Sequence, residues 1–163
     1  MGNISVRITT LQDLEEIMQI YARARTFMQA HGNPNQWTNY PSEALIIAEI
    51  KQYHSFICLN DSGNIIGTFC FIKGEDHTYN TIEGAWLNNK PYATIHRIAS
   101  SGQEKGVFKA CVDWCLRQWP NLRIDTHPDN IPMQNAILKN GFKKCGIIRL
   151  ADGSKRIAYQ LTI

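Results

Sequence analysis

Residues 95–119, with the sequence IHRIASSGQEKGVFKACVDWCLRQW, decide how the rest of the chain is interpreted. Their apolar start predicts a short strand, a loop with Gly102 and Gly106 follows, and an amphipathic helix runs up to Pro120. A glycine-bearing loop before a helix lays backbone N–H groups and the positive helix end against an anion. The stretch therefore predicts an anion-binding site, and the remaining sequence has to indicate which anion it holds.

Composition places the chain among ordinary globular proteins. Of its 163 residues, 44% are hydrophobic and 19% are charged, which suits a single domain, residues 1–163, with a sizeable core. The net charge of +3 is small and the basic residues are scattered, so we expect no nucleic-acid partner. The sequence has no membrane-spanning apolar run, and residues 1–10 lack the apolar core that a signal peptide would need. We therefore expect a cytoplasmic protein without a membrane partner.

The cysteines favour buried thiols over disulfides or a metal site. Their number, five, is odd, and no CxxC or HxxxH pair accompanies them as a metal site would need. A reducing compartment and no bound metal are the expectation. The cysteines are Cys58, Cys70, Cys111, Cys115 and Cys145.

Hydrophobic periodicity predicts the order β-α-α-β-β-β-α-β-α-β-β. Hairpin loops and one parallel βαβ crossover indicate a mixed sheet, and hence an α/β or α+β domain. Residues 81–87 are interpreted as either a short strand or an ordered loop. The predicted strands are 4–8, 56–59, 65–72, 92–99, 122–126, 145–150 and 156–161, and the helices begin near 11, 42, 107 and 133.

Two motifs in this element order resemble the GNAT superfamily of N-acetyltransferases. The family's acyl-CoA motif, Gln/Arg-x-x-Gly-x-Gly/Ala, matches residues 103–108, except that Phe108 stands where Gly or Ala is usual. The second motif matches at Asn130, Gly141 and Phe142, with Ile137 where the family has tyrosine. The strings HRIASSG and IDTHPDNIPMQ are similar to a bacterial subgroup whose substrates are mostly unassigned. The resemblance implies a GNAT-like acyl-CoA N-acyltransferase fold, with a mixed central sheet flanked by about four helices.

The resemblance also implies acetyl-CoA as the co-substrate. Ile98 and Ser100 would bind the pantetheine arm through their backbone, and Asn130 would lie near that arm, cap a helix, or do both. Lys105 either contacts phosphate or is simply a solvated loop lysine. The backbone amides expected at the pyrophosphate are those of Gln103, Glu104, Lys105, Gly106, Val107 and Phe108.

Three residues are candidates for the acid–base chemistry of acetyl transfer to an amine. Asp125 matches a position where some relatives carry a catalytic glutamate, and His127 lies two residues further along the same predicted strand. His127 is alternatively a turn histidine bonded to Asp129. His96 points either into the substrate cleft or under a helix. Ile137 cannot supply the proton that the family's tyrosine gives to the leaving thiolate.

The acceptor is expected to be a primary amine of a small molecule or a peptide. Glu83 would bind a cationic amine, unless it is a solvated loop carboxylate, and three aromatic side chains would line the acceptor pocket, unless they belong to the core. A non-catalytic CoA-binding or sensor domain is the alternative function, and no Walker A loop or dinucleotide fingerprint is present. A monomer or homodimer is the expected assembly. The three aromatic residues are Trp37, Trp86 and Tyr92.

Overall fold

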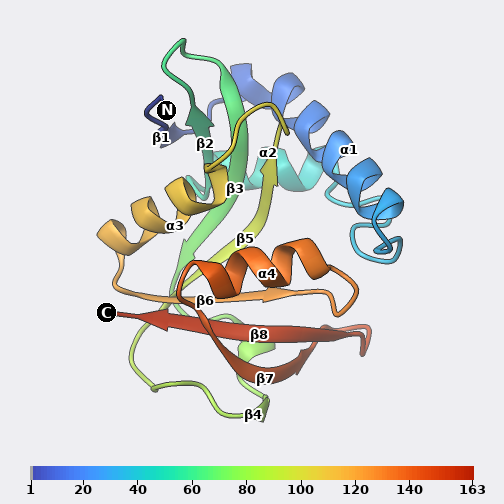
Figure 1. Ribbon diagram of the computed structural model, residues 1–163, viewed down its shortest axis with the longest axis vertical. Helices are drawn as coiled ribbons and strands as arrows, with labels where there is room; N and C mark the ends of the chain where they lie inside the picture. The colour runs from blue at the N-terminus through green and yellow to red at the C-terminus, as the bar shows by residue number, and fades with distance from the viewer. Residues whose placement is uncertain (1) are drawn as a thin grey trace.

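The computed structural model describes residues 2–163 and shows one mixed sheet with helices on both of its faces (Figure 1). The strand order across the eight-stranded sheet is β1-β2-β3-β5-β6-β8-β7-β4. The strands are β1 (Ser5–Ile8), β2 (Ser55–Leu59), β3 (Ile65–Lys73), β4 (Glu83–Gly84), β5 (Ala93–Ser100), β6 (Asn121–Thr126), β7 (Lys143–Arg149) and β8 (Lys155–Thr162). The helices are α1 (Leu14–Ala30), α2 (Glu43–Lys51), α3 (Val107–Gln118) and α4 (Ile131–Lys139), with 3₁₀ turns η1 (Leu11–Asp13) and η2 (His77–Tyr79).

The predicted fold class and element order are confirmed, with two refinements. Residues 81–87 contribute a two-residue strand, β4, which pairs with β7 at the sheet edge. The first helix starts as the 3₁₀ turn η1 because the Asp13 carboxylate accepts the Thr10 N–H at 2.8 Å and pairs with Arg7 at 2.9 Å. The thiols of Cys58, Cys70, Cys111 and Cys115 are buried, as predicted, while Cys145 is partly exposed.

Alternation along the strands separates two apolar layers. Ile57 packs with α1 and α2 on one face, whereas its neighbour Cys58 packs with α3 on the other. Buried Ile137 of α4 belongs to the same layer as α3. The sheet therefore has α1 and α2 on one face and α3 and α4 on the other.

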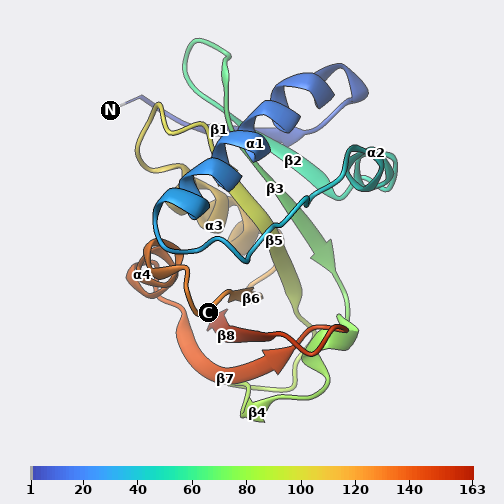
Figure 2. The ribbon, with the colours of Figure 1, turned by 90° about the vertical axis from the view of Figure 1, so that its right-hand side faces the viewer.

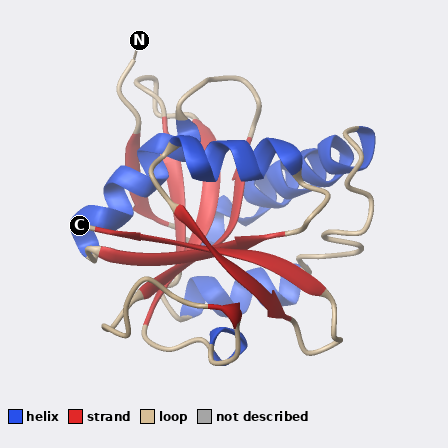
Figure 3. Cartoon of the chain, turned by 60° about the horizontal axis from the view of Figure 1, so that its bottom comes forward, coloured by secondary structure: helices blue, strands red, loops and turns tan. Residues whose placement is uncertain are grey.

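The sheet opens at its centre, between the two strands that run parallel. β5 and β6 pair only at Ala93↔Leu122 and Thr94↔Arg123. Beyond these residues the strands diverge, and the C-terminal strands run across the N-terminal ones (Figures 2 and 3). The edge of β5 that faces β6 consequently leaves the backbone groups of residues 95–100 without a β6 partner, and buried backbone groups require one.

A bulge interrupts β5 beside this opening. Against β3, the pairs Thr68↔Ala99 and Cys70↔His96 leave β5 one residue longer than its partner. Arg97 lies within the extra length and has a φ of 52°, a left-handed conformation that is uncommon for arginine. The bulge turns backbone groups out of the β3–β5 ladder next to the opening.

Gly67 of β3 sets how closely α3 approaches the sheet. A Cβ added at Gly67 would lie 2.6 Å from Val107 Cγ1 and 3.2 Å from the Ala99 carbonyl oxygen. We expect Gly67→Ala to lower the free energy of unfolding by about 1–3 kcal/mol through overpacking, measured by urea denaturation. In the Gly67→Ala/Val107→Ala double variant the side-chain clash is removed, so its loss should be smaller than the sum of the single losses. Strict additivity would contradict a steric role for this contact.

Candidate active site

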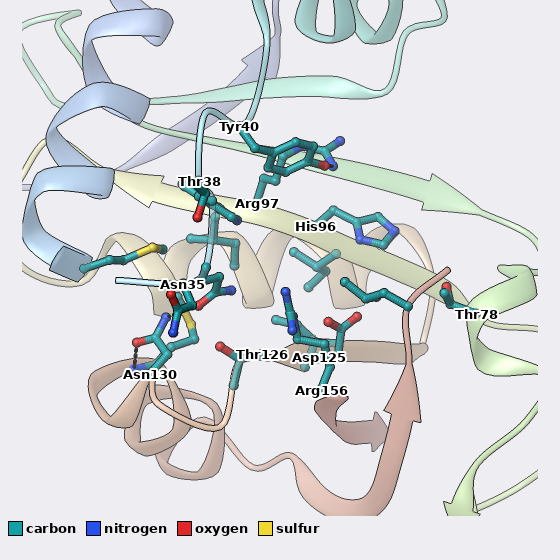
Figure 4. A pocket seen from close by; sticks show the side chains of 18 of the residues that line it. Asn35, Thr38, Tyr40, Thr78, His96, Arg97, Asp125, Thr126, Asn130 and Arg156 are labelled. Atoms are coloured by element: carbon teal, nitrogen blue, oxygen red, sulfur yellow. Dashed lines mark hydrogen bonds between the residues drawn. The ribbon is translucent and has the colours of Figure 1, made fainter. Parts of the chain in front are cut away.

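A cavity of about 550 Å³ lies where β5 and β6 diverge (Figure 4). Its upper wall is β5 from Ile95 to Ile98, and its lower wall is β6 from Ile124 to Thr126. The loop after α1 contributes Trp37 and Tyr40 among others, and α4 contributes residues of its first turn. Because its walls come from strands far apart in the sequence, the cavity is a product of the sheet topology.

His96 reaches this cavity from β5 and is held by a carboxylate. Its Nε2 atom lies 3.2 Å from Asp76 Oδ2. The hydrogen bond from His96 lowers the pKa of Asp76 to about 2, with further bonds from Thr78, although partial burial opposes the shift. Because a carboxylate only accepts hydrogen bonds, neutral His96 donates Nε2–H to Asp76 and keeps its lone pair on Nδ1. His96 is therefore an oriented proton acceptor.

Asp125 faces the cavity from β6, on the wall opposite His96 (Figure 4). The buried Tyr79 hydroxyl donates a hydrogen bond to Asp125 Oδ2 at 2.6 Å. Burial raises the pKa of Asp125, while protonated His96, the Tyr79 hydrogen bond and the charge of Arg156 each lower it in part. Burial also raises the pKa of Tyr79, which keeps the phenol a neutral donor. The two walls thus carry an imidazole and a carboxylate that face the same space.

A buried ion pair fixes the bulged strand to α2 and to the loop after α1. Arg97 pairs with Glu49 of α2, and its guanidinium also donates to the Tyr40 hydroxyl. Tyr40 additionally lies over the guanidinium, with the ring centroid 5.6 Å from Arg97 Cζ. This cluster holds one wall of the cavity in place.

The predicted anion loop lies outside this cavity, at the start of α3. Gly106 is the N-cap residue of α3 with a φ of 88°, and Gly102 has a φ of 80°, conformations that favour glycine. Glu104 turns toward the β2–β3 hairpin, where its carboxylate accepts a hydrogen bond from Asn60 at 2.9 Å. Phe108 packs against the apolar core, which explains how a large residue fits where the family usually has a small one.

Five predicted site residues line the cavity together: Trp37, His96, Ile98, Asp125 and Asn130. Trp37 also packs edge-on against Tyr21, with ring centroids 5.6 Å apart. Asn130 caps α4 by accepting the Met133 N–H at 3.2 Å and donates to Gln36 at 3.0 Å. Both residues therefore have a structural role besides facing the cavity.

The structure corrects the expected position of His127. β6 ends at Thr126, so the alternation that would place His127 on the face of Asp125 does not extend that far. The Nδ1 atom of His127 accepts the Asp129 N–H at 3.0 Å, and the side chain does not line the cavity. Burial lowers the pKa of His127, as does Arg156, although Asp129 opposes the shift. His127 is a turn residue.

Three predicted acceptor residues also lie elsewhere. Exposed Glu83 pairs with Arg149 at 3.2 Å. Trp86 and Tyr92 lie against the Arg123 guanidinium, with ring centroids 4.0 and 3.9 Å from its Cζ. None of the three lines the cavity. Their interactions hold β4 and its loop against β6 and β7, and this packing accounts for the side chains without a substrate.

Sequence reasoning missed four polar residues of the site: Asp76, Tyr79, Thr126 and Arg156. Asp76 is the N-cap of the 3₁₀ turn η2 and Tyr79 is its last residue, while Thr126 and Arg156 lie on neighbouring strands. No spacing in the sequence connects them to His96 or Asp125. Tertiary structure alone brings them together. Within residues 2–163, the His, Cys, Asp and Glu side chains form no cluster of three suited to a metal ion.

Solved structures that superpose on this chain along nearly its whole length include acetyltransferases. A GNAT-family acetyltransferase from Streptococcus agalactiae 2603 is 30% identical and superposes with a TM-score of 0.90, covering 98% of this chain and 95% of its own. A GNAT-family acetyltransferase from Listeria monocytogenes 4b F2365 shares the fold at 17% identity and a TM-score of 0.72, with the same shares of the two chains covered. The fold, including the sheet that opens between β5 and β6, is therefore that of an acetyltransferase class.

The chain belongs to the GNAT family of acetyltransferases, as the similarity to the Streptococcus protein along nearly its whole length shows. A scan against models of protein families finds no match, and a search of curated proteins finds none either. Among residues 2–163, no helix combines the length and the apolar character that crossing a membrane requires.

Proposed function

We propose that the protein transfers an acetyl group from acetyl-CoA to a primary amine of a small molecule or a peptide. The observation that carries this proposal is the cavity between the diverging halves of β5 and β6, with His96 and Asp125 on opposite walls. Membership of the GNAT family supports acetyl transfer in general. The co-substrate, the acceptor, a cytoplasmic location and a monomeric or homodimeric assembly belong to the proposal.

Residues next to the cavity fit the arm of CoA. The unpaired edge of β5 around Ile98 and Ser100 offers backbone groups to the amides of the pantetheine arm, as an added strand would use them. Asn130 lies on the other side of the same opening. The amides of residues 103–108 stand at the glycine-capped start of α3, where a pyrophosphate is favoured by the helix dipole. Lys105 remains a candidate for an additional phosphate contact.

The cavity residues suit the proton transfers of the reaction. An amine with an unperturbed pKa of about 10.4 is mostly protonated at pH 7, so Asp125 would hold the ammonium group and His96 Nδ1 would remove its proton. The free amine attacks the thioester carbon, and the oxygen gains negative charge beside the β5 bulge, where an N–H turned out of the ladder stabilises it. The C–S bond then breaks, the thiolate leaves with the electron pair, and the nitrogen, now part of an amide, gives its remaining extra proton to solvent or to the thiolate.

Ile137 is the observation that favours the alternative function, a non-catalytic CoA-binding or sensor domain. Ile137 is a residue of α4 and is fully buried in the apolar layer that α4 shares with α3, so this position presents no hydroxyl to the cavity. A thiol has a pKa near 8.5, however, and its anion is a tolerable leaving group without a dedicated acid. The oriented His96 and buried Asp125 favour the enzyme.

Release of CoA thiol from acetyl-CoA, measured with a panel of primary amines, tests the proposal. We expect turnover that depends on an amine, together with saturable CoA binding by calorimetry. Tight CoA binding without turnover across amino acids, polyamines, aminoglycosides and peptides would instead establish the sensor function. Absence of CoA binding would contradict both functions.

A further inference from the structure

We propose that the acceptor carries a carboxylate beside its amine, as an α-amino acid does, and that Arg156 and Thr126 bind this carboxylate. This inference rests on the proposed acetyltransferase function and specifies its substrate class. It starts from a guanidinium and a hydroxyl that line the cavity. Within residues 2–163, the guanidinium uses only part of its hydrogen-bond donors and the hydroxyl has no hydrogen-bond partner.

Arg156 enters the cavity from β8, next to Asp125. The register between β6 and β8 pairs Asp125 with Ala158 and Thr126 with Ile157. Arg156 therefore lies diagonally across from Asp125, within reach of a long side chain. Figure 4 shows the guanidinium beside the Asp125 carboxylate, on the wall below His96.

The guanidinium of Arg156 is only partly used by the protein. Its Nη1 atom donates to the Lys155 carbonyl at 2.8 Å and lies 3.5 Å from Ser154 Oγ. Among residues 2–163 it forms no ion pair, whereas Arg97, the other arginine of the cavity, is paired with Glu49. Within that same range the hydrogen bonds of Arg156 use Nη1 alone, and the Nε and Nη2 donors together form the planar fork that suits a carboxylate.

Thr126 supplies an independent sign of a missing partner. Thr126 is 1% exposed and lines the cavity. Its Oγ1 atom has no hydrogen-bond partner within residues 2–163. A buried hydroxyl without a partner is costly. In Figure 4 the Thr126 oxygen points into the cavity from the strand that also carries Asp125. A bound carboxylate oxygen would accept this hydroxyl's hydrogen bond.

The charges of the cavity distinguish between classes of amine. Asp125 favours an ammonium group, and adjacent Arg156 favours an anion, so a molecule with both groups a few bonds apart matches the pair. Asp152 also lines the cavity, but it is exposed, and solvent screens its charge. A polyamine would bring only positive charge to Arg156. A peptide N-terminus would bring an amide where the carboxylate is expected. A free amino acid therefore fits better than either.

Matched acceptors test this inference. For each of several L-amino acids, kcat and KM are measured alongside the corresponding amide and the decarboxylated amine. We expect the acid to exceed both analogues at least roughly tenfold in kcat/KM, since a charge-assisted bidentate pair contributes to binding. Arg156→Gln should lower kcat/KM for the acid by roughly 10- to 100-fold, mainly through KM, and Arg156→Lys should lose less.

The decarboxylated amine is the internal control, because it has no carboxylate for Arg156 to bind. The ratio of kcat/KM for the acid to kcat/KM for the amine therefore cancels any effect of Arg156 on Asp125, and Arg156→Gln should lower this ratio at least roughly tenfold. Equal activity toward acid, amide and amine, or an equal loss for all three in Arg156→Gln, would overturn the inference and leave the acetyltransferase function standing. No thiol release with any amine would overturn the function as well. Thr126→Val should also lower the ratio of kcat/KM for the acid to kcat/KM for the decarboxylated amine, although by less than Arg156→Gln does. An unchanged ratio in Thr126→Val would exclude the hydroxyl from the carboxylate site.

Discussion

Replacing Asp125 with asparagine is expected to lower kcat/KM for amine acetylation about 100- to 10,000-fold. Asparagine has nearly the same shape and retains an oxygen that accepts the Tyr79 hydroxyl, which in the wild type lies 2.6 Å from Asp125 Oδ2. It lacks the charge that would hold the ammonium group opposite His96. Steady-state thiol release with the best amine of the panel measures the effect.

The raised pKa of Asp125 predicts both a pH profile and a stability change. Burial raises this pKa above the ordinary aspartate value, so Asp125 should contribute an acidic limb to kcat/KM above about 3.9, and this contribution should be absent in Asp125→Asn. A raised carboxyl pKa means that folding favours the protonated form, and this stabilisation is lost as pH rises through the raised pKa. At pH 7, Asp125→Asn should therefore melt at or above the wild-type temperature.

Two companion variants accompany Asp125→Asn: one replaces the proposed base, and the other is a control outside the cavity. His96→Gln should also lower kcat strongly, because the nitrogen that accepts the proton is lost while Asp76 retains a donor. Asp129→Asn should change neither kcat nor KM, since Asp129 is an exposed turn residue outside the cavity. Wild-type kcat/KM in Asp125→Asn, or a large loss in Asp129→Asn, would contradict the assignment of Asp125 to the site.

Replacing Glu49 with leucine is expected to cost about 3–5 kcal/mol of unfolding free energy, because it leaves the charge of Arg97 buried without a partner. Glu49 is 7% exposed, and the Arg97 side chain is 10% exposed. Glu49 also accepts a hydrogen bond from the Cys70 thiol at 3.3 Å. Urea denaturation followed by circular dichroism measures the loss.

Replacing both partners provides the internal control for this pair. Glu49→Leu/Arg97→Met leaves no buried charge, so most of the stability should return. The ion pair between Lys109 and Asp113 on α3 is a surface counterpart, with side chains 68% and 45% exposed, and Asp113→Asn should cost less than about 0.5 kcal/mol. If Glu49→Leu costs no more than Asp113→Asn, the buried pair does not stabilise this wall of the cavity.

Local patterns predicted the elements well because local forces form them. The second helix is predicted to begin near residue 42, where serine favours a helix start, and the Ser42 hydroxyl accepts the Leu45 N–H at 3.2 Å. Asn and Gly favour a helix end, and α4 is followed by Asn140 and by Gly141 with a φ of 94°. Similarly, the strand before residues 101–106 and the glycine-capped helix after them are present. Each of these features depends on residues that are close together in the chain.

The acceptor residues were less predictable because their environment comes from distant segments. Trp86 and Tyr92 are aromatic and near predicted strands, and nothing in their spacing shows that Arg123 lies between their rings. His127 directly follows the last residue of β6, so the alternation that would place it on the face of Asp125 does not reach it. Strand boundaries depend on pairing partners, which sequence periodicity does not identify.

The sequence by itself therefore determined the elements, their order, the glycine-capped start of α3 and the residue types available for acid–base chemistry. Tertiary structure decided which of these residues meet. The divergence of β5 from β6 opens the cavity, the bulge at Arg97 shapes its wall, and the β6–β8 register brings Arg156 beside Asp125. The physical reason is that helices and turns are stabilised by neighbours in the chain, whereas a site between strands depends on long-range pairing.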